Sequence, residues 1–201
     1  IEDAESTLQK MKDCHIGHLS IGASTTLCRY ILLPHLKHFT EQFPNIQVSL
    51  KNQDSAKTLQ ILEAQEIDIA LTAIPKHLGL NQSIILEQEV EDVFVASPNY
   101  MEKMKELHGN NFSLFKDATV MLMDEQNVSR RYVDSYIREN QLDFKQIITL
   151  NTMDLLIDFA KIDMGIACVI RAFVEKDLKD GSLVEITLSS PIPKRKIGFM
   201  Y

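Results

Sequence analysis

Apolar residues along the chain follow two patterns, an alternation typical of strands and a spacing of three to four residues typical of amphipathic helices. Near the start of the sequence the two patterns take turns, each strand-like run being followed by a helix-like one. This order is typical of βαβ units, in which helices cover a parallel sheet. The predicted elements are strands at 18–22, 46–50 and 67–71, a helix at 25–43 and a second helix that begins at Asp54 or Ser55.

A second series of the same kind follows the turn-rich stretch 75–82. It starts with the apolar run 93–96 and a helix start at Ser97-Pro98, where proline suits the first turn. The length of 201 residues is compatible both with one α/β domain and with two small lobes. The remaining predicted elements are strands at 119–123, 146–150, 165–170, 183–188 and 197–201 and helices at 128–140, 152–162 and 172–179.

The helix predicted at 25–43 has an unusually wide apolar surface. Besides the residues at helical spacing, it carries Leu27, Ile31 and Leu33. A helix that is apolar on more than one side needs a second partner, such as another subunit. Pro34 falls inside it and is expected to kink or split it, because proline has no N–H to donate.

The net charge of −7 argues against direct binding of nucleic acid, which requires a basic surface. Two basic clusters are present, Arg130-Arg131 and Lys194-Arg195-Lys196. Clusters this small are typical of a solvated face, and we expect them to lie at the surface. The absence of Trp weakens any function that needs aromatic platforms for bases or sugars.

The three cysteines, Cys14, Cys28 and Cys168, form no CxxC motif, and their odd number indicates free thiols in a reducing compartment. The sequence contains no apolar signal region at its start and no apolar run of about 18 residues. We therefore expect a cytoplasmic protein without membrane contact. The pairs His15/His18 and His35/His38 have metal-like spacing but lack further ligands nearby, so we interpret them as surface histidines and expect no metal.

Several segments, in this order and spacing, resemble the LysR-type effector-binding domain over about residues 17–201. No single motif is specific, but the set is. The segments are 17–26 (GHLSIGASTT), 33–36 (LPHL), 43–46 (FPNI), 62–71 (LEAQEIDIAL), 93–98 (VFVASP), 165–167 (GIA) and 178–183 (LKDGSL).

This resemblance implies an α/β fold of two Rossmann-like lobes joined by two crossing strands, similar to type 2 periplasmic binding proteins, with a ligand cleft between the lobes. Lobe I would hold residues 17–93 and 197–201, and lobe II residues 94–196. Residues 1–16 would be the end of a linker helix. The family's helix-turn-helix domain and the lobe I helix expected after Tyr201 are absent from this sequence, so DNA would be bound only through that N-terminal domain.

Ser24, Thr25 and Thr26 follow the first predicted strand and begin a helix. Ligands of open parallel sheets bind beyond the carboxyl ends of the strands, where helix N-termini present free amides. These hydroxyls are suited to hold a small anion. The alternative is that one of them only caps the helix.

Further ligand-binding candidates lie at the ends of other strands. The resemblance places Thr72 and Ser129 toward the ligand, although Thr72 also fits an ordinary strand end. Asn127 or Ser129 can equally be a helix cap, and Ser97, expected at the crossing between the lobes, can bind ligand or cap a helix. The weakest candidates are Asn151 and Thr152, and Arg130 is expected to face solvent.

These observations predict a cytoplasmic sensor of a small anionic metabolite in a LysR-type regulator, acting as a homodimer, with a tetramer open to the full-length protein. No GxSxG, P-loop, GxGxxG or HExxH motif occurs, so we expect no catalytic residues and no cofactor. Thiol switching in the family uses two neighbouring lobe II cysteines, whereas only Cys168 lies in lobe II here. The alternative is a stand-alone solute-binding protein of the same fold.

Overall fold

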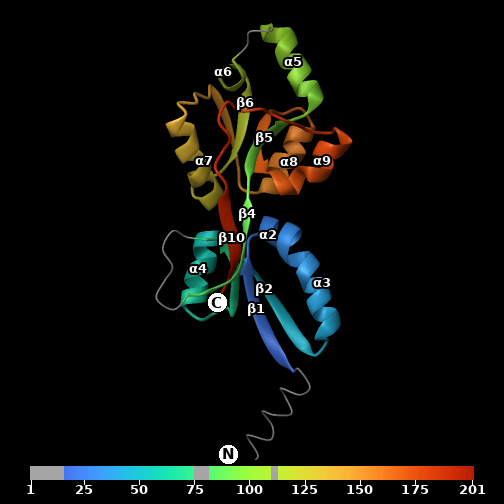
Figure 1. The fold of residues 1–201 in the computed structure, drawn as a ribbon, viewed down its shortest axis with the longest axis vertical. Helices are drawn as coiled ribbons and strands as arrows, with labels where there is room; N and C mark the ends of the chain where they lie inside the picture. Colours follow the sequence, from blue (N-terminus) through green and yellow to red (C-terminus); the bar gives the residue numbers. More distant parts are fainter. Residues whose placement is uncertain (1–15, 75–81, 110–112) are drawn as a thin grey trace, which may run out of the picture. The chain divides into compact units, whose positions relative to one another are not determined.

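The computed structural model describes residues 16–74, 82–109 and 113–201. The chain forms two compact units, each with one five-stranded sheet (Figure 1). The first unit extends to Gln88 and resumes at Ile197, and the second runs from Glu89 to Lys196. The first passage between the units therefore lies at residues 88–89, whereas the resemblance had placed it at residues 93–94. The reason is that Val93 already pairs within the second sheet. The linker helix expected at 1–16 lies outside the described residues, except for Ile16.

The first unit has a sheet with the strand order β2-β1-β3-β10-β4. Strands β2 and β3 run parallel to β1, whereas β10 runs antiparallel to β3. The strands are β1 (Gly17–Ala23), β2 (Ile46–Asn52), β3 (Ile69–Ala73), β4 (Ile84–Val90) and β10 (Arg195–Met200), and the helical segments are α2 (Thr25–Leu27), η1 (Cys28–Leu32), α3 (Leu33–Gln42) and α4 (Ser55–Glu63).

The second unit has a sheet with the strand order β7-β6-β8-β5-β9. Strands β7 and β8 run parallel to β6, and β5 runs antiparallel to β8 and β9. The strands are β5 (Asp92–Ala96), β6 (Thr119–Met123), β7 (Gln146–Leu150), β8 (Ile166–Ile170) and β9 (Val184–Glu185). The helical segments are α5 (Pro98–His108), α6 (Leu114–Asp117), α7 (Val128–Glu139), α8 (Met153–Lys161), η2 (Arg171–Val174) and α9 (Glu175–Asp180).

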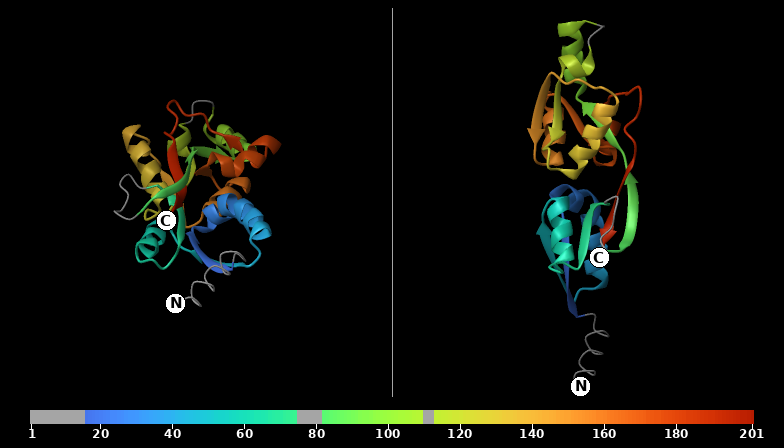
Figure 2. Two further views of the ribbon diagram at one scale, coloured as in Figure 1. Left: turned by 60° about the horizontal axis from the view of Figure 1, so that its bottom comes forward. Right: turned by 90° about the vertical axis from the view of Figure 1, so that its left-hand side faces the viewer.

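In both units the helices cover the two faces of the sheet. The connection β1-α3-β2 runs toward one edge of the first sheet, and β2-α4-β3 runs back. Because such crossovers are right-handed, the two helices must lie on opposite faces. Figure 1 shows this for α3 and α4 and for α7 and α8, and the right-hand view of Figure 2 shows α4 in front of the first sheet.

The helix predicted at 25–43 is split, as Pro34 requires. It passes through one π-helical stretch, where the N–H of Leu33 reaches back to the carbonyl of Cys28, before α3 begins with Pro34 in its first turn. No residue of α3 is buried. Leu33 keeps 58% of its surface exposed and Ile31 is half-buried, whereas Leu27 is buried, so only part of the wide apolar face found in the sequence is available for a partner.

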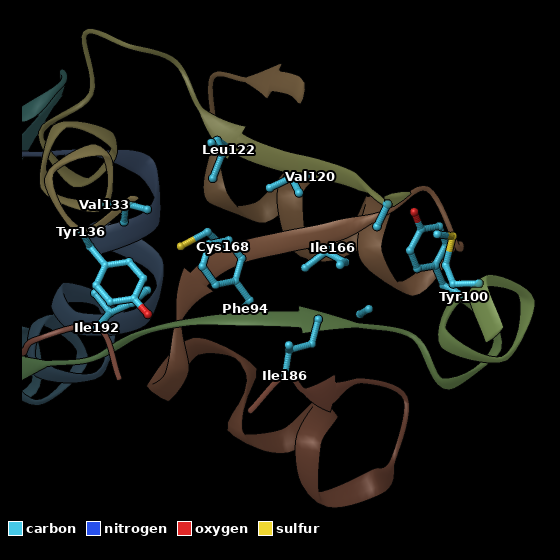
Figure 3. Packing of buried hydrophobic residues seen from close by; sticks show 13 residues of the cluster. Phe94, Tyr100, Val120, Leu122, Val133, Tyr136, Ile166, Cys168, Ile186 and Ile192 are labelled. Atoms are coloured by element: carbon cyan, nitrogen blue, oxygen red, sulfur yellow. The ribbon is translucent and has the colours of Figure 1, made fainter. Parts of the chain in front are cut away.

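The core of the second unit surrounds β5 and β8, whose residues are all buried. Phe94 pairs with Cys168 across the two strands, and their side chains lie side by side in the core (Figure 3). Val120 of β6 and Val133 of α7 belong to the same cluster. Burial on both faces explains why these strands are continuous apolar runs in the sequence.

One strand was not predicted, and one predicted strand is much shorter in the structure. Strand β4 was not expected, because its residues are mostly exposed and alternate poorly. The strand predicted at 183–188 shrinks to Val184–Glu185, although Leu183 and Ile186 on either side are buried. At 183–188 the apolar spacing therefore indicates burial rather than strand pairing.

Candidate functional site

The first sheet gathers most of the predicted ligand residues at one edge. Because β1 and β3 are parallel, their carboxyl ends lie at the same edge, and Ser24, Thr25, Thr26 and Thr72 come at or directly after these ends. Thr26 is buried, and Thr25 exchanges hydrogen bonds with Asn52, whose Nδ2 lies 2.8 Å from the threonine hydroxyl. Asn52 ends the neighbouring parallel strand and was missed because one amide after a strand carries no distinctive signal.

Besides Thr25, which is paired with Asn52, two more of these four hydroxyls have structural partners. Ser24 caps the helix by accepting a hydrogen bond from the Leu27 N–H at 3.3 Å. The Thr72 hydroxyl is fully buried and donates to the carbonyl of Ala73 at 3.1 Å. Thr26, whose hydroxyl forms none of these hydrogen bonds, therefore remains the strongest ligand candidate in this unit.

The second sheet has an equivalent edge, where β6 ends and α7 begins. Asn127 caps α7 by accepting a hydrogen bond from the Ser129 N–H at 2.8 Å, which settles which of the two residues is the cap. The Ser129 hydroxyl is half-buried and accepts a hydrogen bond from Arg195 Nη2, also at 2.8 Å. Thr152 caps α8 in the same way through the Leu155 N–H at 3.4 Å.

Arg195 forms a buried ion pair with Asp92 beside this edge. Its Nε lies 2.6 Å from Asp92 Oδ2 and its Nη2 lies 3.0 Å from Asp92 Oδ1. This bidentate contact fixes the orientation of the guanidinium group. The two side chains are 7% and 2% exposed. Charges this deeply buried are tolerated in proteins when they are paired and hydrogen-bonded, as here.

The prediction of solvated basic clusters is therefore wrong for one member of each cluster. Arg130 is buried, donating to the Met123 carbonyl at 2.8 Å and to Asp134 at 2.7 Å, so the expectation that it faces solvent is also wrong. Arg195 is buried because it lies in a strand, where it points away from the face of exposed Lys194 and Lys196. The strand predicted here began at residue 197, so alternation along it did not reach Arg195.

Ser97 lies at the other edge of the second sheet, and its expected place at the crossing is wrong. Strand β5 runs antiparallel to β8, so its carboxyl end is opposite the edge that holds Asn127 and Ser129. The Ser97 hydroxyl caps α5 through the Tyr100 N–H at 3.0 Å and donates to Asp163. This hydrogen bond is the main reason why the pKa of Asp163 lies below its usual value.

Other kinds of chemistry find no support in the described part of the chain. Residues 16–74, 82–109 and 113–201 contain no group of three or more side chains placed to bind a metal. No helix within these ranges is long and apolar enough to cross a membrane. Cys168 is buried, and burial raises the pKa of its thiol well above the ordinary value, which disfavours the reactive thiolate.

Comparison with known sequences gives one consistent family. The family model described as LysR substrate binding domain matches residues 14–201. A probable RuBisCO transcriptional regulator of Phaeodactylum tricornutum is 26% identical over 190 residues, which cover 89% of this chain and 59% of the relative. This chain therefore spans less than two thirds of that relative's length.

Two solved structures have similar folds. The regulatory domain of CcmR from Synechocystis, in complex with 2-PG, has a TM-score of 0.72 at 17% identity and covers 92% of this chain and 87% of that one. The effector binding domain of QuiR, in complex with shikimate, has a TM-score of 0.69 at 13% identity, with the same coverage of both chains. The fold is that of LysR effector-binding domains and is similar to type 2 periplasmic binding proteins. With its match over residues 14–201, this chain belongs to the LysR substrate binding domain family.

Proposed function

We propose that this chain is the effector-sensing part of a cytoplasmic LysR-type transcription regulator, which binds a small anionic metabolite between its two units. The observation that carries this proposal is the family match over residues 14–201. The curated relatives are transcription regulators, which favours this function over a stand-alone solute-binding protein. DNA binding would belong to a helix-turn-helix domain of the longer protein.

The anionic character of the effector is supported by the groups at the two sheet edges. Thr25, Thr26 and Ser129 place hydroxyls in the first turns of helices, where free backbone amides also favour negative charge. The similar domains of CcmR and QuiR are in complex with 2-PG and shikimate, which supports a small molecule as the effector here.

The sensor would work by a shift between arrangements of the two units. A ligand changes such an equilibrium only if it binds one arrangement better than the other, and equal binding changes nothing. Residues from both units must therefore contact the effector, and Thr26 and Ser129 are the pair we assign to this role. The dimer would pass the shift to the DNA-binding domains.

The dimer contact is assigned to the helical run 25–42 with the neighbouring edge strand β2. Leu33 is 58% exposed and Leu50 of β2 is 47% exposed, so both are available to a second copy. A charge at Leu33 should weaken the dimer because it would be desolvated in the contact. Sedimentation of Leu33→Glu tests this, with Leu107→Glu, which changes a 76% exposed leucine on α5, as the matched control. If Leu33→Glu associates as strongly as the wild type, this helix does not form the dimer contact.

A thermal-shift screen of central metabolites tests the effector site. A ligand at about 100 times its Kd stabilises a protein by about 2.7 kcal/mol, which raises the Tm of a chain this long by roughly 5–10 °C. The double variant Thr26→Ala/Ser129→Ala should lose this shift while its ligand-free Tm stays nearly unchanged. Thr40→Ala/Ser189→Ala, which removes two hydroxyls from exposed residues, should keep the shift. A double variant that still binds the hit would reject the assignment.

A further inference from the structure

The contact between Arg195 and Ser129 constrains the chemistry that this serine can offer. A serine hydroxyl has one proton to donate and lone pairs that accept. Arginine is always a donor, so the 2.8 Å contact from Arg195 Nη2 uses the hydroxyl oxygen as an acceptor. The proton must then point elsewhere, and within residues 16–74, 82–109 and 113–201 the structure gives it no protein acceptor. Ser129 is only half-buried as a residue, which leaves it partly accessible to a ligand.

Arg195 is itself held rigidly. Asp92 binds it through both carboxylate oxygens, and the guanidinium carbon lies 6.0 Å from the centre of the Tyr132 ring. The Tyr132 hydroxyl lies 3.0 and 3.2 Å from the carbonyl oxygens of Pro193 and Lys194 and shares its one proton between them, so α7 also holds the backbone that leads into Arg195. Because Arg195 is already fixed, it holds the Ser129 hydroxyl in one orientation. Less conformational entropy is then lost when this hydroxyl binds a ligand.

We propose that Arg195, held by Asp92, is a positioning residue for effector binding: it fixes the Ser129 hydroxyl as a hydrogen-bond donor, so that the second unit selects effectors presenting an oxyanion. This inference rests on the proposed function and names the class of ligand group, a carboxylate, sulfate or phosphate oxygen, that faces α7. Asp92 balances the charge of Arg195, so the selection comes from the direction of the hydroxyl proton and the amides of α7 rather than from net positive charge.

The position of the pair in the chain adds to its importance. Asp92 lies just after the first passage between the units, and Arg195 lies just before the second. One buried pair therefore joins both connecting segments to the turn that carries Ser129. The Ser129 hydroxyl is thus one hydrogen bond from the second segment, through Arg195, and two from the first, through Arg195 and Asp92.

Titration calorimetry with inorganic sulfate, at constant ionic strength set with chloride, tests the inference. Sulfate offers only acceptor oxygens, and we expect saturable binding to the wild-type chain. Ser129→Ala should weaken sulfate binding roughly tenfold or more, as expected for a hydrogen bond to a charged group. Arg195→Met should weaken it by a similar factor, and Ser129→Ala/Arg195→Met should be no weaker than either single variant, because both changes remove the same oriented hydroxyl.

Because Arg195→Met leaves Asp92 as an unpaired buried charge and can unfold the chain, Asp92→Asn/Arg195→Met supplies a neutral pair in which the same donor is missing. This variant should fold and still show the weakened sulfate binding. Arg195→Lys should not restore affinity, because lysine keeps the charge but not the planar fork that grips Asp92 and Ser129 together.

Four outcomes would overturn the inference. Unchanged sulfate affinity in the folded Asp92→Asn/Arg195→Met variant would leave Arg195 a purely structural role. Independent losses that multiply in Ser129→Ala/Arg195→Met, or rescue by Arg195→Lys, would mean that the charge of Arg195 attracts the anion directly. Absence of saturable sulfate binding in the wild type would reject the oxyanion class. In that last case, a neutral hit in the metabolite screen would still uphold effector sensing, although it would contradict the anionic character of the effector.

Discussion

Replacing Asp92 with alanine should be among the most destabilising single changes in the second unit. The carboxylate is 2% exposed and is the only acid that the structure pairs with Arg195 among the described ion pairs. Without it, a guanidinium that is 7% exposed loses both its counter-charge and two hydrogen bonds at 2.6 and 3.0 Å. Removal of one partner from a buried pair costs about 3–5 kcal/mol, since the remaining charge stays desolvated.

Urea unfolding followed by far-UV circular dichroism measures this loss. With an m-value of about 2–3 kcal/mol/M, the midpoint should fall by roughly 1–2.5 M. The control is Glu66→Ala, which breaks the pair with Lys51 in which the side chains are 56% and 42% exposed. Exposed pairs contribute about 0–1 kcal/mol. If Asp92→Ala and Glu66→Ala shift the midpoint equally, the buried pair does not hold this region together.

A second prediction concerns the same pair. The loss in Asp92→Ala comes from an unpaired charge, so neutralising both partners should recover much of the stability. Asp92→Asn/Arg195→Met should therefore unfold at a higher urea concentration than Asp92→Ala. A double variant that is less stable than Asp92→Ala would show that the hydrogen bonds of Arg195, rather than charge balance, dominate the energetics.

Three further predictions concern packing, pH and reactivity. Gly198→Ala should lower stability by about 1–3 kcal/mol in urea unfolding, because the new Cβ would lie 2.4 Å from the carbonyl oxygen of Leu86. The pKa of Asp163 is lowered in the folded chain relative to its usual 3.8. The stability that this group contributes is therefore present above pH 3.8 and is lost as the pH falls through the lower folded pKa, so Asp163→Asn should flatten the acid side of a plot of Tm against pH. Cys168 should resist iodoacetamide at pH values near neutrality until denaturant is added, as judged by mass spectrometry; rapid labelling in the native state would contradict its burial.

Local signals in the sequence were sufficient for most secondary structure. The strands at 119–123 and 146–150 have the bounds that were predicted, because the apolar and β-branched residues of each lie within one short segment between turn residues. Helix starts were equally readable. Ser24 and Asn127 each accept a hydrogen bond from an N–H two or three residues later, so the whole interaction lies within a few residues of sequence.

The tertiary structure decided where these elements bring polar side chains together. Ser97 was found as a helix start, but only the antiparallel direction of β5 reveals that it lies at the opposite sheet edge from Ser129. Arg195 looked like one of three solvated basic residues, and its partner Asp92 is 103 residues away. Composition cannot tell a buried charge from an exposed one, because the desolvation cost is offset only where the fold supplies the counter-charge. Sequence spacing thus determined the elements, whereas strand direction and long-range pairing determined which groups of the candidate site meet.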